Sequence, residues 1–151
     1  MNKYKPLTDE QHVAFATMLR KAWQTLAGSH LPLAPLTDAK LRLQDKLVLL
    51  AGKLANESGH HVLYDISFPV PSRPVLTIED HRQLGESLYF ARNSLFRLLN
   101  CYPKQNTITR RLSSLIDGFD RLRCKLDSYV AGKWPGEFDP SIYYPAARLA
   151  A

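Results

Sequence analysis

The chain has 151 residues, of which 45% are hydrophobic and 23% are charged, and its formal net charge is +6 at pH 7. This composition excludes wholesale disorder, and the length suffices for one domain, spanning residues 1–151, with its own hydrophobic core. No apolar run approaches the ~18 residues that a membrane span needs, and the N-terminal residues lead into an amphipathic segment rather than a signal peptide. We therefore expect a soluble, cytoplasmic protein that does not enter a membrane.

The first part of the chain predicts two amphipathic helices, at about residues 9–27 and 38–58. Thr8 is followed three residues later by a glutamine, which is the spacing of a capping box at a helix start. The link between the two helices contains Pro35 and a second proline, so it cannot be helical throughout. Thr37, just after these prolines, is the predicted cap of the second helix.

A long irregular crossover is predicted at about residues 59–76. It begins with a short run of alternating apolar residues, but three prolines follow at once and exclude a central strand. A loop of this length is usually functional or packed, so we expect it to lie extended over the helices. Further helices are predicted at about 78–101 and 107–131. The expected fold is therefore an all-α, single-domain four-helix bundle.

The fourth predicted helix carries its charges sorted by sign. At 100° per residue, its apolar side chains form one broad stripe with a charged flank on either side. One flank is cationic, with Arg110, Arg111, Arg121 and Lys125. The other is anionic, with Asp117, Asp120 and Asp127. The cationic ridge suits an acidic partner such as a nucleic-acid backbone, whereas the alternative is a solvated helix whose edges pair with neighbouring helices.

Basic residues on the first two helices bear on the same question. They are Arg20 and Lys21 on the first helix, and Lys40, Arg42, Lys46 and Lys53 on the second. If the fourth helix lies beside either of these helices, their cations extend the ridge into a groove. Such a groove would follow phosphates rather than read bases, because no helix-turn-helix spacing is present.

The third helix offers a candidate ligand or catalytic site at His81, Tyr89 and Arg92, which border its core face. Arg92 lies at the margin of the core, where a guanidinium must meet a carboxylate, a carbonyl or a ligand phosphate. The simpler alternative is an arginine that bridges two helices through an acidic neighbour.

The segment that starts Arg92-Asn93 and ends at Arg97 resembles the Arg-Asn-x-x-x-His element of HEPN ribonucleases, all-helical proteins that cleave RNA as dimers. Arg97 stands where that family has its essential histidine, so no general acid or base is present there. The resemblance therefore implies a relative that binds RNA without cleaving it.

The C-terminal tail, residues 133–151, is rich in proline and aromatic residues. Its aromatic side chains include Trp134, Phe138, Tyr143 and Tyr144. Extended segments of this composition dock into grooves on partner proteins. The alternative is a strap that closes one side of the bundle, and the sequence leaves both alternatives open.

Little in the sequence supports a disulfide, a metal site, a cofactor site or a catalytic centre. Cys101 and Cys124 would lie about 24 Å apart along adjacent helices, too far for a disulfide, so both should be free thiols. No metal-ligand spacing, glycine-rich phosphate loop or catalytic elbow occurs, so we predict no metal, no cofactor and no catalytic residue. Gly85 and Gly118 lie inside predicted helices, where glycine is less favourable than alanine, so each indicates close packing against a neighbouring helix. One arrangement packs each glycine against the helix that carries the other.

The sequence thus predicts a non-catalytic, basic helical protein that associates with a nucleic-acid backbone, DNA or RNA, or with an acidic protein. An accessory subunit of a nucleoprotein assembly is one form of this function. The alternative is a protein-interaction module, such as an adaptor, an inhibitor or an immunity-type partner, that docks through the bundle surface or the tail. A third, weaker alternative is a HEPN-like or other helical enzyme. The oligomeric state stays open.

Overall fold

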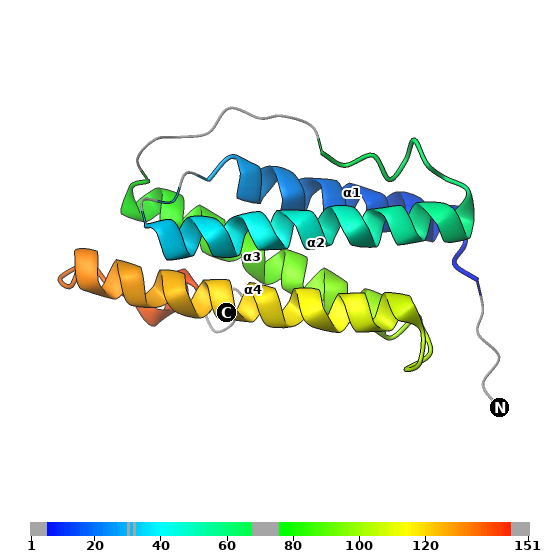
Figure 1. Ribbon diagram of the computed structural model, residues 1–151. Coiled ribbons are helices and arrows are strands. Elements are labelled where there is room, and N and C mark those ends of the chain that lie inside the picture. The colour runs from blue at the N-terminus through cyan, green and yellow to red at the C-terminus, as the bar shows by residue number, and fades with distance from the viewer. Residues whose placement is uncertain (1–5, 30, 32, 68–75, 146–151) are drawn as a thin grey trace.

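The computed structural model describes residues 6–29, 31, 33–67 and 76–145. Its four long helices are α1 (Asp9–Ala27), α2 (Ala34–Ser58), α3 (Ile78–Leu99) and α4 (Thr107–Lys133), followed by a short 3-10 helix, η1 (Pro140–Ile142) (Figure 1). The described residues contain no β-strand. The predicted all-α fold with four packed helices is confirmed.

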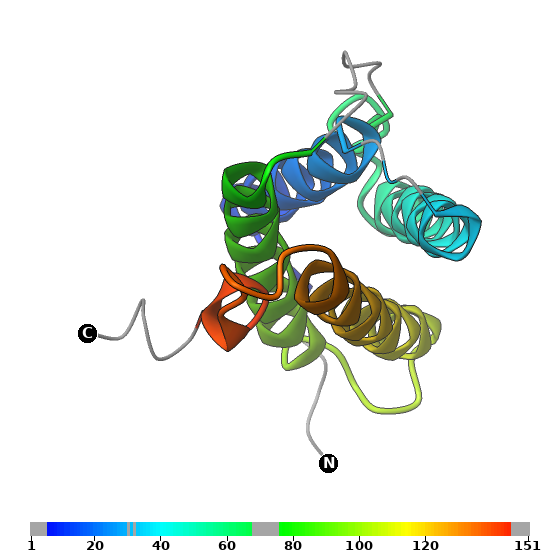
Figure 2. The same ribbon diagram turned by 90° about the vertical axis from the view of Figure 1, so that its left-hand side faces the viewer.

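The four helices form a ring in the order α1, α2, α4, α3 when viewed end-on (Figure 2). Each helix packs chiefly against the two neighbours in this ring, and neighbours run in opposite directions. This ring places α4 between α2 and α3. One flank of α4 therefore meets α2 and the other meets α3, which decides where its two sets of charges point.

The core at the centre of the ring is rich in leucine and receives side chains from every helix. Fully buried members include Leu19 and Leu26, Leu47 and Leu54, Leu95 and Leu98, and Leu112 and Phe119. Burial of each such side chain stabilises the fold by about 1.5–3 kcal/mol. These residues fall on the apolar stripes that the helical periodicity predicts.

Local capping interactions explain where the helices begin, but the predicted start of the second helix needs a correction. Thr8 and Thr77 both form capping boxes, the first as predicted from its spacing. The second helix, however, begins at Ala34 rather than after Thr37. Pro35 is accommodated in its first turn, where the missing N–H has no helical partner to lose. The Thr37 hydroxyl instead donates a hydrogen bond back to the carbonyl of Leu31, at 3.0 Å.

The connection between α2 and α3 must be long because these two helices run in the same direction (Figure 1). With 25 residues, α2 spans about 37 Å, and the chain has to return over a similar length before α3 begins. In its described part, Tyr64 is buried and its hydroxyl lies 2.6 Å from Nδ1 of His12 on α1. The predicted crossover therefore packs over α1 in residues 59–67, while residues 68–75 lie outside the described part of the chain.

The C-terminal segment after α4 folds back onto α3 as a strap. Ile142 and Tyr143 are fully buried, and an ideal Cβ placed on Gly85 of α3 would lie 1.8 Å from the carbonyl oxygen of Ile142. Gly85 thus packs against η1, not against α4. Gly118 of α4 instead faces α2, where its ideal Cβ would lie 2.5 Å from Leu43. Each glycine indicates close packing, but neither packs against the other's helix.

Two further findings concern the whole described chain. None of its helices combines the length and the apolar character needed to cross a membrane. Cys101 and Cys124 are both free, and Cys124 is exposed.

Candidate nucleic-acid interface

The two charged flanks of α4 face different neighbours. Asp120 points toward α3, where its Oδ1 accepts a hydrogen bond from Nε of Arg92 at 3.2 Å. Nη1 of Arg123, one turn along α4, lies 3.5 Å from the same oxygen. Asp127 is half-buried, and this burial raises the pKa of its carboxyl group. Within the anionic flank, Asp120 is thus engaged by two arginines, one oxygen of Asp127 is buried without a hydrogen-bond partner among the described residues, and Asp117 remains exposed.

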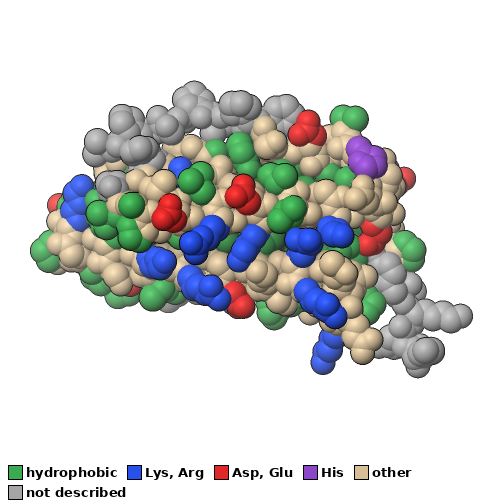
Figure 3. All heavy atoms as spheres, viewed as in Figure 1, with side chains coloured by type: hydrophobic (Ala, Val, Ile, Leu, Met, Phe, Trp, Pro, Cys, Tyr) green, Lys and Arg blue, Asp and Glu red, His purple; other side chains and the backbone are tan. Residues whose placement is uncertain are grey.

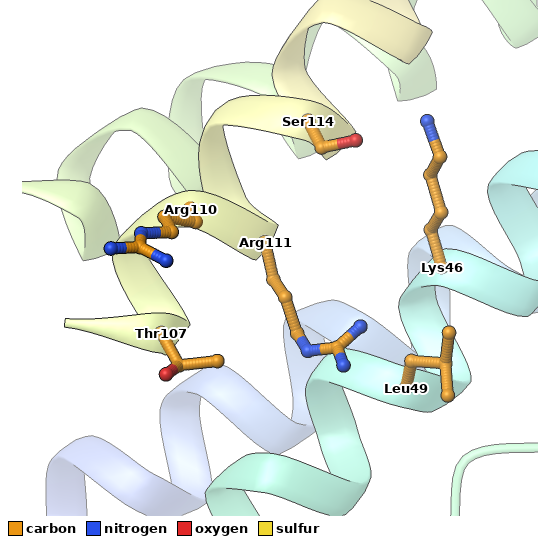
Figure 4. A pocket seen from close by; sticks show the side chains of 6 residues that line it. All are labelled: Lys46, Leu49, Thr107, Arg110, Arg111 and Ser114. Carbon is orange, nitrogen blue, oxygen red and sulfur yellow. The ribbon is translucent and has the colours of Figure 1, made fainter.

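The cationic flank of α4 lies beside α2. Gly118 marks the seam between the two helices, because an ideal Cβ there would touch Leu43 and lie 3.9 Å from Nζ of Lys46. A hollow of about 370 Å³ opens next to this contact. Its lining comes from both helices and comprises Lys46, Leu49, Thr107, Arg110, Arg111 and Ser114 (Figure 4).

Helical periodicity extends this basic surface along both helices. Arg121 and Lys125 lie three and seven residues beyond Gly118, so they share its face of α4. Arg42 and Lys53 lie four residues before and seven residues after Lys46, so they share its face of α2. We call this set the cationic seam: Arg42, Lys46, Lys53, Arg110, Arg111, Arg121 and Lys125. Figure 3 shows Lys and Arg side chains gathered in a band across α2 and α4.

Acidic side chains border the band of cations in Figure 3, but direct ion pairs with the seam are lacking among the described residues. No carboxylate lines the hollow, and within the described residues no ion pair joins any of the seven cations to an acid. Five of the seven side chains are exposed, and Lys46 and Arg111 are half-buried. Side by side in a hollow, such charges raise the local positive potential and attract anions.

Three other basic residues that the sequence offered as part of the ridge lie outside the seam. Lys40 is buried, and its Nζ donates a hydrogen bond to the carbonyl of Ser29 at 2.9 Å. Arg20 donates to the carbonyls of Leu63 and Asp65 in the crossover. Lys21 is exposed on α1, which lies across the ring from α4. The groove therefore extends from α4 to α2 only, and Lys40 is not part of it.

The three candidate residues on α3 do not line an open site together. His81 is only 1% exposed, and its Nδ1 is hydrogen-bonded to the hydroxyl of Tyr143. Burial lowers the pKa of His81 to about 4, so the imidazole is neutral at pH 7. Arg92 forms the helix-bridging ion pair with Asp120, the simpler of the two alternatives for this residue. Tyr89 lies beside the guanidinium of Arg123, which shares Asp120 with Arg92.

The tail residues differ in what they leave exposed. Tyr143 is fully buried, so it has no surface to offer a partner in this fold. Trp134 and Phe138 are half-buried against the core. Tyr144 is 43% exposed and covers the guanidinium of Arg123 at 4.6 Å from its ring centre. Between Trp134 and Tyr144, the tail therefore acts as a strap.

Arg123 is the residue that sequence reasoning missed. It is buried, and its Nε and Nη2 donate to the carbonyl of Tyr143 at 2.9 and 2.8 Å. The available signal was its position, since it lies four residues after Phe119 and three before Leu126, at the edge of the apolar stripe. An arginine at such a position needs an acceptor inside the protein.

Comparisons with protein-family models, with curated proteins and with solved structures find no match to this chain. Among the described residues, no group of three or more His, Cys, Asp or Glu side chains is placed to hold a metal ion.

Proposed function

We propose that this protein binds the phosphate backbone of a nucleic acid through the cationic seam between α2 and α4. The observation that carries the proposal is the gathering on one face of cations from two helices, without ion pairs among the described residues, around a hollow that no carboxylate lines. Such a surface exchanges bound counterions of the nucleic acid for protein cations, and this exchange provides sequence-independent affinity.

The seam favours backbone contact over base recognition. Base reading in a duplex requires an element that enters a groove, but α4 is packed between α2 and α3 and does not stand apart from the ring. Base stacking in a single strand requires aromatic side chains, and none lines the hollow. The proposed role is therefore that of a non-catalytic protein that holds DNA or RNA by its phosphates, such as an accessory subunit of a nucleoprotein assembly.

The experiment is a salt series with matched charge variants. Fluorescently labelled double- and single-stranded DNA and RNA are titrated with the protein between about 50 and 200 mM salt, the range over which phosphate contacts weaken strongly. The seam variant carries Arg121→Gln and Lys125→Gln. The control carries Lys21→Gln and Arg97→Gln, which remove the same charge from exposed positions on α1 and α3.

The seam variant is expected to lower the slope of log K against log salt by up to ~1.8, because each lost phosphate contact to a duplex contributes ~0.9. The control should keep the slope of the original protein. If the original protein binds none of the four probes at the low-salt end, the proposal is wrong, and the seam then fits the second predicted partner, an acidic protein.

A further inference from the structure

The hollow between α2 and α4 differs from the rest of the cationic seam because it is a recess with donors on several sides. Lys46 approaches from α2 and Arg111 from α4, while Arg110 of α4 also lines the recess but directs its guanidinium away from the other two cations (Figure 4). Thr107 and Ser114 add hydroxyl groups, and Leu49 provides an apolar wall that is 52% exposed. All polar side chains in the lining can donate a hydrogen bond, and none is acidic.

Arg111 is the strongest indication of a ligand. Its Nε is buried and has no hydrogen-bond partner among the described residues. A buried donor without an acceptor costs free energy, so it favours any ligand that supplies the acceptor. Three other cations that are not exposed, Arg123, Lys40 and Arg20, each donate to backbone carbonyls. Arg111 differs from them because no hydrogen bond within the described part of the chain uses its guanidinium, which borders the recess.

The geometry of the helices keeps the recess open. Because Gly118 has no side chain, Leu43 packs directly onto α4 and Lys46 reaches its surface. In Figure 4, Lys46 and Arg111 extend from opposite helices on either side of the hollow, and the Ser114 hydroxyl points toward Lys46. The recess lies in the first turns of α4, where the helix dipole adds positive potential.

We propose that this recess is a specific seat for one phosphate group of the bound nucleic acid. Arg111 offers a planar fork for two phosphate oxygens, and Lys46 contributes a point charge from the opposite helix. Arg110 completes the rim, and Leu49 contacts the attached sugar. A volume of about 370 Å³ accommodates a phosphate together with its sugar. The nature of the ligand rests on the proposed function, whereas the seat itself rests on the recess and on Arg111.

The test separates the seat from general charge attraction. The seat variant carries Lys46→Gln and Arg111→Gln, and its matched control is the seam variant with Arg121→Gln and Lys125→Gln. Both have a net charge two below that of the original protein, and both change the same surface. Affinity for a labelled duplex is measured for the two variants at one low salt concentration.

A second measurement uses inorganic phosphate and the unaltered protein, so it does not depend on how a variant folds. Sodium phosphate is added at constant ionic strength, against sodium chloride, while ¹⁵N-resolved NMR follows the arginine Nε–H groups and the backbone amides of Thr107 and Ser114. Saturable shifts at Arg111 and at these amides, without comparable shifts at Arg121, are expected.

The seat variant should lose about tenfold more duplex affinity than its control, because hydrogen bonds to charged groups contribute more than general attraction. Equal losses, together with phosphate shifts spread evenly over the seam, would overturn the seat while leaving the proposed function intact. Saturable phosphate binding by a protein that binds no nucleic acid would support the seat and overturn the proposed function.

Discussion

Two buried histidine–tyrosine pairs attach the irregular segments of this protein to its helices. His12 on α1 contacts the hydroxyl of Tyr64 in the crossover, and His81 on α3 contacts the hydroxyl of Tyr143 in the strap. Burial lowers the pKa of both histidines and raises the pKa of both tyrosines. In each pair, both partners are therefore neutral at pH 7, and the hydrogen bond links uncharged groups.

Acid is expected to weaken the contact made by His81. The surroundings of its ring are aromatic, with Tyr129, Trp134 and Tyr143 in contact, and the nearby charges are Asp80 and Lys133. Its pKa is about 4 in the folded chain against 6.5 in the unfolded chain, so the unfolded chain takes up the proton first as the pH falls. The free energy of unfolding is thus unaffected above pH 6.5 and decreases between pH 6.5 and 4, by at most ~1.4 kcal/mol per pH unit.

Urea unfolding between pH 7.5 and 4 checks this expectation when the original protein is compared with His81→Gln. The amide of glutamine can still accept a hydrogen bond from Tyr143, but it does not titrate. The difference in the free energy of unfolding between the two proteins should therefore change below pH 6.5, whereas the carboxyl groups and His12 contribute equally to both. A difference that is constant over the whole range would show that His81 does not carry this pH dependence.

At the scale of the elements, glycine decides where two segments approach most closely. Gly85 lies inside α3 at the point where η1 crosses it. Gly52 lies inside α2, and an ideal Cβ there has no neighbour within 4 Å. Intrinsic helix propensity favours alanine over glycine at both positions by about 1 kcal/mol. The two sites therefore separate the effect of packing from that of propensity.

Gly85→Ala is expected to destabilise the protein, because its Cβ would collide with the backbone carbonyl of Ile142 and displace the strap. Gly52→Ala is expected to stabilise the protein by about 0.5–1 kcal/mol. Thermal unfolding followed by circular dichroism measures both effects. An increase in the midpoint for both variants would mean that the strap does not pack against Gly85 as the structure has it.

At the scale of the whole molecule, the C-terminal strap completes the packing of α3 and α4. Ile142 and Tyr143 are fully buried, and the buried Arg123 depends on the carbonyl of Tyr143 for two hydrogen bonds. The cationic seam lies on α2 and α4, whereas η1 packs on α3. Stability and the proposed binding therefore depend on different parts of the ring.

Removal of residues 134–151 is expected to lower the free energy of unfolding by several kcal/mol, since full burial of each large apolar side chain contributes about 1.5–3 kcal/mol. Nucleic-acid affinity at a temperature where the shortened chain remains folded should stay near that of the original protein. Thermal unfolding and the low-salt binding assay measure the two properties. An unchanged midpoint together with lost binding would instead identify the tail as a docking segment.

The sequence by itself determined the helices, because capping, periodicity and proline placement act between residues close in the chain. It also predicted that both cysteines are free. It predicted that the crossover packs over the bundle, which holds for the described part of that segment. It placed the start of α2 too late, since Pro35 is equally compatible with a link and with a first helical turn. It also missed Arg123, whose partner lies in the strap, 20 residues further along the chain.

Only the tertiary structure decided which helices are neighbours. The sequence sorted the charges of α4 into two flanks but left open what each flank would meet. The ring order places Asp120 against Arg92 on α3 and places the cations of α4 beside Lys46 on α2. Contacts between helices depend on packing over the whole core, and no local pattern encodes them. The candidate phosphate seat therefore exists only once α2 and α4 lie side by side.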